Sequence, residues 1–219
     1  MAPPRPPKLE SYRSEQVAQA YDQRWAGRGG ERRDRRKARA LERALRSLER
    51  RSGKAARSLL DVPCGTGRFA GLLLDRGLDY TGADLSLEML SMARAKAPAA
   101  RLLSADAARL PFDDASFDVV ICVRFLHLVR DPALRTGFLR ELRRVARLGV
   151  VAGYHHSRTL RGASRRLRHK VGLRERPPAN PSPARIRADF AAAGFGELDW
   201  ITVHFAPLLS DKVLVAARA

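Results

Sequence analysis

The chain has 219 residues, and its 42 Lys and Arg against 23 Asp and Glu give a net charge of +19. This length fits one medium-sized domain, or one domain with an appendage. The longest uninterrupted apolar run, residues 119–123, is too short to cross a bilayer, so we expect no transmembrane segment. The first residues lack the apolar stretch of a secretory signal, and two cysteines allow one disulfide at most. We therefore expect a reduced protein in the cytoplasm.

The first quarter of the chain is expected to be helical after a Pro-rich start. Residues 14–25 place apolar side chains on one helical face. The three glycines within residues 27–30 predict a break. Residues 31–51 then repeat apolar side chains at helical spacing, with charged side chains elsewhere. We interpret residues 1–57 as an N-terminal helical cap.

From residue 58 onward, short apolar runs alternate with helical patterns. The runs, typical of strands buried on both faces, cover residues 58–62, 80–84, 101–105, 117–123 and 149–154. The helical patterns cover 68–76, 85–96 and 132–147, and a helix over 182–195 precedes strands over 199–205 and 211–217. This alternation predicts a doubly wound α/β fold in three layers, with a mostly parallel sheet and an antiparallel last strand. Residues 58–219 are thus expected to form one domain, with a basic and Pro-rich insertion over 155–183.

The segment DVPCGTGR, residues 61–68, closes the first predicted strand and opens the first helix. Gly65 and Gly67 let the backbone turn tightly and approach a ligand at the carboxyl edge of the sheet. The spacing Gly65-x-Gly67-x-x-Ala70 also fits a loose dinucleotide fingerprint. The turn alone therefore leaves a nicotinamide cofactor open.

Three acids stand at the ends of three predicted strands. Asp61 precedes the glycine turn, where a carboxylate would repel a pyrophosphate but would suit a sulfonium or ammonium group. Asp84 ends the second strand and is placed to accept hydrogen bonds from ribose hydroxyls. Asp106 follows the third strand, where it could accept from an adenine amino group. Together the acids predict a site for a cationic adenosine derivative, whereas NAD would need only Asp84.

The ordered segments LLDVPCGTGR, YTGADLSLEML, SADAARLPFDDASFDVVICVRFLHLV and FLRELRRVAR resemble the class I S-adenosylmethionine-dependent methyltransferases. The similarity is strongest to the small-molecule branch that includes the ubiquinone and menaquinone methyltransferases, and it covers about residues 58–154. It implies a Rossmann-like fold and S-adenosyl-L-methionine as cofactor. Two positions depart from the family pattern: Pro63 replaces the first glycine of the turn, and the turn before the fifth strand is shorter.

The resemblance also implies a set of cofactor-binding residues. Gly65 and Gly67 would underlie the methionine part, Asp84 would bind the ribose, and Asp106 with Ala107 would border the adenine. Val123 would close the pocket. The full set comprises Tyr21, Asp61, Cys64, Gly65, Thr66, Gly67, Asp84, Leu85, Met89, Asp106, Ala107 and Val123.

Candidates for the chemistry follow the fourth and fifth predicted strands. His127 stands where substrate should meet cofactor and has a pKa range suited to a general base, although it could instead pack the following helix. Arg124 either binds an anionic substrate group or pairs with a nearby acid. One of His155 and His156 could line the substrate pocket. No Cys, Asp or Glu stands beside these histidines at ligand spacing, so we expect no metal site.

The positive charge is concentrated on either side of a nearly neutral centre. Residues 1–57 hold 17 cations and 7 anions, residues 157–176 hold 8 and 1, and residues 58–156 hold 13 and 11. The spacing in 157–176 predicts a short basic amphipathic helix over the substrate side. This helix could bind acidic groups of a substrate, a lipid surface as a peripheral membrane contact, or RNA, or it could simply be solvated.

The sequence therefore predicts methyl transfer to a small-molecule or lipid-like acceptor, and the charge favours an anionic one. RNA methylation is the first alternative. The turn at Arg124–His127 lacks the Asn/Asp-Pro-Pro-aromatic pattern of amino-methylating enzymes, but 2′-O and base-carbon chemistries stay open. An NAD(P)-dependent oxidoreductase or a non-catalytic binding module is the second alternative, and it leaves Asp61 and Asp106 unexplained. The oligomeric state is not predicted.

Overall fold

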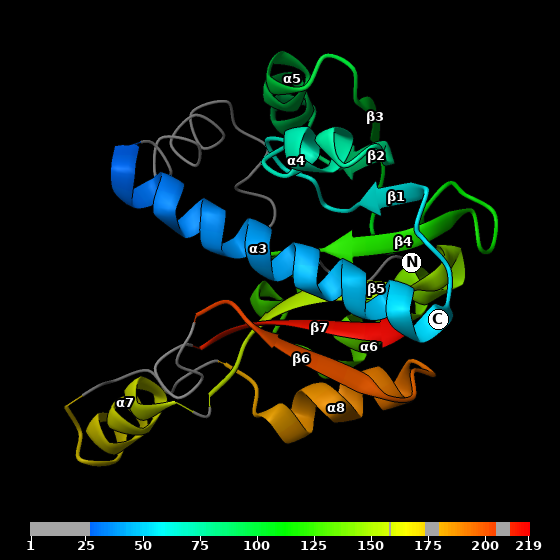
Figure 1. The fold of residues 1–219 in the computed structure, drawn as a ribbon. Helices are drawn as coiled ribbons and strands as arrows, with labels where there is room; N and C mark the ends of the chain where they lie inside the picture. Colours follow the sequence, from blue (N-terminus) through cyan, green and yellow to red (C-terminus); the bar gives the residue numbers. More distant parts are fainter. Residues whose placement is uncertain (1–26, 158, 174–179, 205–210) are drawn as a thin grey trace.

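A computed structural model describes residues 27–157, 159–173, 180–204 and 211–219, and these residues form one seven-stranded sheet (Figure 1). The strand order is β3-β2-β1-β4-β5-β7-β6. The strands are β1 Ser58–Asp61, β2 Asp79–Asp84, β3 Arg101–Ser104, β4 Phe117–Cys122, β5 Ala146–His155, β6 Leu198–Thr202 and β7 Lys212–Arg218. Strands β1 to β5 pair in parallel, and β7 is antiparallel to both of its neighbours. The predicted mostly parallel sheet with an antiparallel last strand is confirmed.

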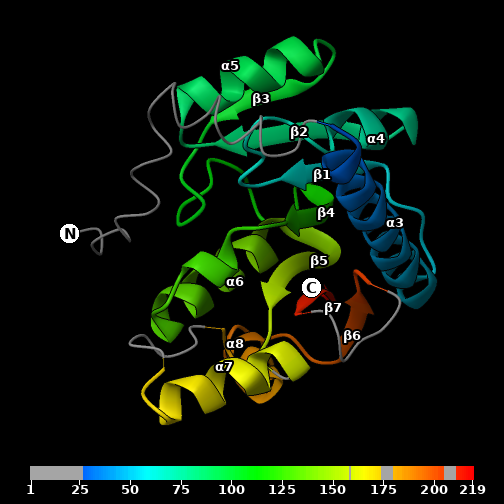
Figure 2. The same ribbon diagram turned by 90° about the vertical axis from the view of Figure 1, so that its left-hand side faces the viewer.

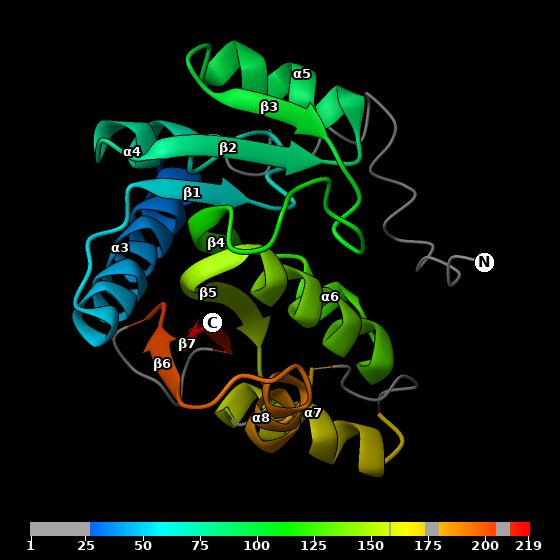
Figure 3. The ribbon, with the colours of Figure 1, turned by 90° about the vertical axis from the view of Figure 1, so that its right-hand side faces the viewer.

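Helices cover both faces of this sheet, which confirms the three-layer prediction. They are α3 Gly27–Ser52, α4 Ala70–Asp75, α5 Leu87–Lys96, α6 Pro132–Val145, α7 Leu160–Lys170 and α8 Pro183–Ala192, with a short 3-10 helix η2 over Leu126–Leu128. Figure 3 shows α3 and α4 on one side of the sheet and α6 on the other, with α5 beside the β3 edge. Helical crossovers between neighbouring parallel strands produce this arrangement.

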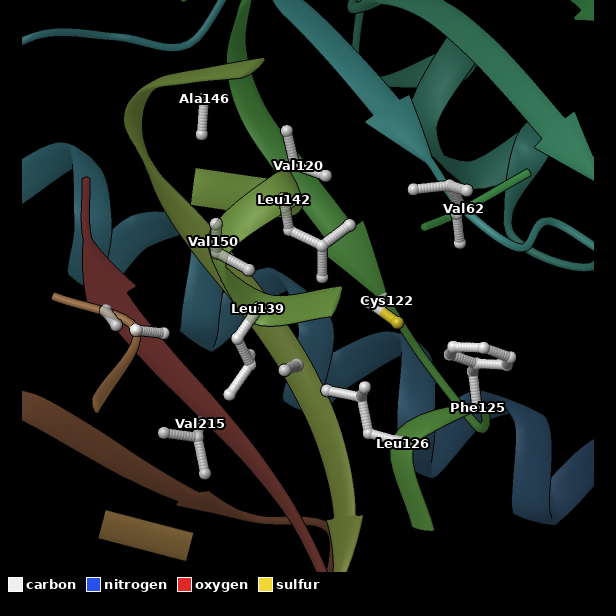
Figure 4. Close-up of a cluster of buried hydrophobic side chains, with 14 of the residues drawn as sticks. Val62, Val120, Cys122, Phe125, Leu126, Leu139, Leu142, Ala146, Val150 and Val215 are labelled. Carbon is white, nitrogen blue, oxygen red and sulfur yellow. The ribbon is translucent and has the colours of Figure 1, made fainter. Parts of the chain in front are cut away.

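The apolar core forms two clusters, one on each face of the sheet, because side chains alternate in direction along each strand. Leu59, Val119 and Ile121 join the cluster under α3, whereas Leu60 and Val120 join the cluster under α6 and α8. Figure 4 shows part of the second cluster, in which Leu139 and Leu142 of α6 lie against Val120 and Val150. Because successive side chains of a strand point to opposite faces, a strand covered on both sides is apolar at nearly every position.

Helix α3 packs directly on the sheet. Its Leu41, Leu45 and Leu48 are fully or almost fully buried, and each such side chain contributes about 1.5–3 kcal/mol by leaving water. Arg51 near its end pairs with Asp199 of β6 at 2.5 Å. The described part of the predicted N-terminal cap thus shares the core of the sheet. A unit boundary at residue 57 stays a prediction.

Several expected boundaries differ from those in the structure, and two of them are informative. The predicted glycine break extends too far, because α3 begins at Gly27, whose φ angle is 78°, and includes the glycines at 29 and 30. The first amides of a helix need no intrahelical partner, and a glycine there costs only about 1 kcal/mol. The helix expected to reach residue 147 ends at Val145, and β5 begins at Ala146 because that residue pairs with Phe117 of β4.

The shortened turn before β5 is confirmed, since no residue separates α6 from β5. A helix within residues 157–176 is also confirmed as α7, which lies beyond the end of β5, on the side toward which β1 and β4 point (Figures 1 and 2). The helix expected over residues 14–25 lies outside the described residues. Among the described residues, no helix is long and apolar enough to span a membrane.

Candidate active site

The loop after β1 requires two glycines. Gly65 and Gly67 have φ angles of 56° and 68°, in the left-handed region that other residues adopt at a cost. A Cβ atom on Gly67 would lie 2.9 Å from the Cβ of Ala93 in α5. The loop also holds α3, because Arg68 forms an ion pair with Asp34 of that helix. The turn is therefore packed closely against α5 and is also tied to α3.

Asp84 joins this turn to the end of β2. One carboxylate oxygen accepts a hydrogen bond from the amide of Gly65 at 2.8 Å, and the other accepts from the amide of Ser86 at 3.0 Å. The residue is 9% exposed. Burial raises the pKa of Asp84, and hydrogen bonds from the amides of Ser86, Gly65 and Leu85 oppose that rise. The carboxylate is thus held in a defined orientation at the carboxyl edge of the sheet.

Asp61 is the more deeply buried acid, with 2% of its surface exposed. Its carboxylate accepts a hydrogen bond from the hydroxyl of Tyr80 at 3.1 Å. Burial raises the pKa of Asp61 to about 8; the Tyr80 hydrogen bond lowers it in part, and the charge of Asp84 raises it further. A buried carboxylate is costly unless a positive charge compensates it. This site therefore fits a ligand that brings a cationic group.

The remaining predicted cofactor residues surround these two acids. Cys64, Thr66 and Met89 are buried, and the amide of Cys64 donates to the carbonyl of Ala83 at 2.9 Å. Burial raises the pKa of the Cys64 thiol above its ordinary range, so it is a packing residue and not a thiolate. Leu85 is half-buried beside Asp84.

Asp106 stands at the neighbouring strand end. The amide of Ala105 donates to the carbonyl of Asp84 at 3.1 Å, which places the loop after β3 beside the end of β2. The Asp106 carboxylate is partly exposed and accepts from the amide of Ala108 at 3.0 Å, while Ala107 is buried. The three acids therefore follow adjacent strands, as expected from the order β3-β2-β1. Tyr21 lies outside the described residues.

A hollow lies at the carboxyl ends of β4 and β5 and at the start of β7, and it is bounded by α3. Four of the predicted residues line it, namely Val123, Arg124 and His127, which follow β4, and His155 of β5. The predicted substrate residue His156 is not among the described lining residues. The other lining residues are Lys37, Leu41, Phe69, Gly153, Tyr154, Val203, Lys212, Val213 and Leu214.

His127 and His155 stack on each other in this hollow. Their ring centroids are 4.4 Å apart and their planes differ by 17°. Burial lowers the pKa of His155 to about 4, assisted by the charges of Lys212, Lys37 and Arg124 and opposed by Asp211. His155 is therefore neutral near pH 7 and can accept hydrogen bonds from a ligand or stack without adding charge.

Arg124 occupies an unusual backbone position at the rim of the hollow. Its φ angle is 70°, and its amide nitrogen lies so near Gly153 that a Cβ there would approach to 3.2 Å. Residues held in the left-handed region cost about 1–3 kcal/mol and occur often at functional sites. The surrounding strands β4 and β5 thus hold the backbone of a charged residue in a conformation that an isolated chain would avoid.

Sequence reasoning missed two lysines that line this hollow. Lys37 is 8% exposed, and burial together with Arg124, Lys212 and Arg33 lowers its pKa to about 7. A signal was available, because Lys37 precedes Leu41 by four residues and therefore shares the apolar face of the predicted helix. Lys212 carries no such signal, because it begins a strand whose pairing with β5 brings it to His155.

No group of three or more His, Cys, Asp or Glu suited to a metal ion is found in the described part of the chain. The two cysteines, Cys64 and Cys122, are both free and buried.

Comparison with known proteins identifies similar chains. Residues 60–152 match a family described as a methyltransferase domain. A demethylmenaquinone methyltransferase of Thermus thermophilus is 34% identical over 166 residues, which cover 65% of this chain and 76% of that protein. An uncharacterized methyltransferase of Mycobacterium tuberculosis is 38% identical over 97 residues, or 44% of this chain, and the match spans only 40% of that relative's length.

The fold is shared with solved structures. Magnesium protoporphyrin IX methyltransferase from Synechocystis, with bound SAH, superposes with a TM-score of 0.61 at 20% identity, covering 84% of each chain. At this level of identity the similarity concerns the fold alone.

Proposed function

Because the chain belongs to the class I S-adenosylmethionine-dependent methyltransferases, we propose that it transfers a methyl group to a small molecule bound in the hollow at the ends of β4 and β5. One observation carries this proposal. Val123, which the family pattern places against the cofactor, also lines the hollow. An acceptor in the hollow would therefore lie next to the reactive part of the cofactor.

The residues around the glycine turn fit S-adenosylmethionine. Asp61, buried and raised in pKa, is suited to compensate a cationic group of the cofactor. Asp84 would accept from the ribose hydroxyls, and Asp106 with Ala107 would border the adenine. Gly65 and Gly67 would lie under the methionine part, where a side chain would interfere. When bound, S-adenosylmethionine supplies an electrophilic methyl group on a sulfonium.

Residues that line the hollow can position the acceptor and accept a proton from it. Methyl transfer is an in-line displacement, so holding the acceptor atom against the methyl carbon lowers the barrier before any acid or base acts. In the proposed reaction an electron pair of the acceptor forms the new bond to carbon while the bond to sulfur breaks. Where the acceptor atom carries a proton, His127 would take it as general base, with the ring supported by its stacking on His155.

The acceptor is proposed only as a small molecule. One relative is named for demethylmenaquinone, and another, from Salmonella typhimurium, is named for a malonyl group on acyl-carrier protein. The two acceptors named differ chemically, so they support methyl transfer to a small molecule without identifying one compound.

The direct test offers the purified protein methyl-labelled S-adenosylmethionine together with either a filtered small-molecule cell extract or total RNA. We expect label to enter the small-molecule fraction. Label that enters RNA alone would refute the proposal and favour RNA methylation. Once the labelled acceptor is isolated, His127→Ala should keep binding S-adenosylhomocysteine but lose most of its turnover. Unchanged turnover would remove His127 from the mechanism.

A further inference from the structure

The end of α7 exposes apolar side chains to solvent. Leu167 and Val171 are 63% and 58% exposed, and Leu173, which follows the helix, is 78% exposed. The amide of Val171 donates to the carbonyl of Leu167 at 3.0 Å, so these two side chains lie one helical turn apart on the same face. Single exposed apolar side chains are ordinary, but a group of them on one segment marks a contact surface.

Positive charge accompanies this apolar row. Arg168 and Lys170 are both exposed, and neither has an ion-pair partner among the residues that the structure describes. The sequence of residues 157–173 contains six Arg and Lys and no Asp or Glu. The charge of the segment is therefore not neutralised by acids of its own, and it favours an acidic partner.

The start of α7 is fixed to the rest of the molecule. The amide of His156 donates to the carbonyl of Asp211 at 2.7 Å, and the amide of Ser157 donates to the carbonyl of Pro181 at 3.0 Å. Figure 1 shows α7 at the edge of the molecule, beyond the end of β5. The helix thus extends from an anchored base that directly follows His155, which lines the hollow.

Among acidic partners, a lipid surface fits this combination best. A helix that combines apolar and basic side chains lies in the boundary between headgroups and acyl chains, with its apolar side chains inserted and its cations among the headgroups. RNA would use the cations, but bases stack on aromatic side chains, and the exposed apolar side chains here are Leu and Val. A second copy of this chain, with its net charge of +19, would bring like charge to the contact.

We propose that the end of α7 and the residues after it bind an anionic lipid surface. Leu167, Val171 and Leu173 enter the headgroup boundary, and Arg168 and Lys170 contact the acidic headgroups. Contact of this kind is peripheral and reversible. It goes beyond the proposed methyl transfer and does not depend on it.

Flotation of the full chain with lipid vesicles measures this contact. The vesicles consist of phosphatidylcholine alone or of phosphatidylcholine with about one third phosphatidylglycerol. We expect the partition coefficient to be at least about tenfold higher for the anionic vesicles. It should fall as the NaCl concentration rises from about 0.1 M to 0.5 M, because salt screens the attraction between the cations and the headgroups.

Two variants separate the apolar from the charged contribution. Leu167→Gln should weaken binding to the anionic vesicles about fivefold or more, because the polar side chain gains little by leaving water. Arg168→Gln combined with Lys170→Gln should weaken it about tenfold or more and reduce its salt dependence. All three side chains are exposed, so these substitutions should leave the melting temperature unchanged.

Matched controls carry the same changes on other helices. Leu87 of α5 is 66% exposed, so Leu87→Gln removes an equally exposed apolar side chain. Arg39→Gln combined with Arg50→Gln removes two exposed charges from α3. Both controls should bind the vesicles like the unmodified protein, because α3 and α5 lie apart from α7 (Figures 1 and 2).

Three results would overturn the proposal: equal binding to the two kinds of vesicle, unchanged binding by Leu167→Gln, or equal losses in the controls. If the charge variant instead loses affinity for an RNA oligonucleotide while its vesicle binding is unchanged, α7 contacts RNA and the lipid assignment is wrong. None of these measurements involves methyl transfer. A failure of the proposed function would appear in the labelling experiment and would leave the vesicle results as they are.

Discussion

Replacing Asp61 by Asn should stabilise the cofactor-free protein while weakening cofactor binding. The native carboxyl group has its pKa raised from 3.8 to about 8, mainly by burial. One pH unit corresponds to about 1.36 kcal/mol, so ionising the buried group costs on the order of 5 kcal/mol more than ionising it in the unfolded chain. Asn retains the shape and the hydrogen-bonding capacity toward Tyr80 but carries no charge to bury.

The sign of the pH dependence follows from proton binding. Between about pH 4 and pH 8 the folded protein keeps the proton on Asp61, whereas the unfolded chain releases it. Because the folded state binds more protons than the unfolded state, the free energy of unfolding falls as the pH rises through this window and levels off above pH 8. Relative to the Asn variant, the unmodified protein should lose about 3–4 kcal/mol of unfolding free energy between pH 5 and pH 8.

Urea unfolding at pH 5, 6, 7 and 8 without cofactor measures this difference. Asp106→Asn is the matched control, because its carboxylate is partly exposed, and it should follow the unmodified protein. Calorimetric titration should also show S-adenosylmethionine binding more tightly as the pH rises from 6 to 8, since a cation favours the ionised carboxylate. A stability difference between Asp61→Asn and the unmodified protein that is constant with pH would refute the argument.

Three further predictions concern the frame of the site. Asp84→Ala should abolish the rise in melting temperature that S-adenosylhomocysteine produces in the unmodified protein; a full rise in the variant would contradict the ribose assignment. Gly67→Ala should lower the unfolding free energy by about 1–3 kcal/mol, because its φ angle is 68° and the new Cβ would meet Ala93 at 2.9 Å; urea midpoints equal to those of the parent would contradict this. Arg135→Met should lower the unfolding free energy by about 1.5–3 kcal/mol, since Arg135 donates to the buried Asp189 at 2.7 Å and its loss leaves that carboxylate with Arg185 alone, at 3.1 Å; a loss below 1 kcal/mol in urea would count against it.

The position of the three acids proposed to bind the cofactor could be predicted from local sequence. The alternation of strands and helices placed the carboxyl ends of β1, β2 and β3 at one edge, and with them Asp61, Asp84 and Asp106. Such a prediction succeeds because Asp61 and Asp84 end their strands and Asp106 follows its strand by two residues, so only strand order is needed to bring the three together. The roles of the individual residues toward the cofactor stay predictions.

The residues that line the hollow proposed to bind the acceptor were harder to predict from the sequence. Arg124 and His127 can be identified from the sequence because they follow a strand. Lys37 shares the apolar face of a predicted helix with Leu41, but the pattern does not show which part of the sheet that face meets. Its burial depends on α3 lying across β5 and β7. Nor does the sequence reveal that Lys212 ends up beside His155, because that contact needs the antiparallel pairing of β7 with β5.

By itself, then, the sequence determined the fold class and the glycine turn, because periodicity, glycine positions and the spacing of acids are local properties of the chain, and its resemblance to known sequences indicated the family. Only the tertiary structure decided which charges share the hollow. That outcome depends on α3, from the first quarter of the chain, and β7, from its end, meeting beside the carboxyl end of β5. Burial in this position then changes the pKa of Lys37 and of His155.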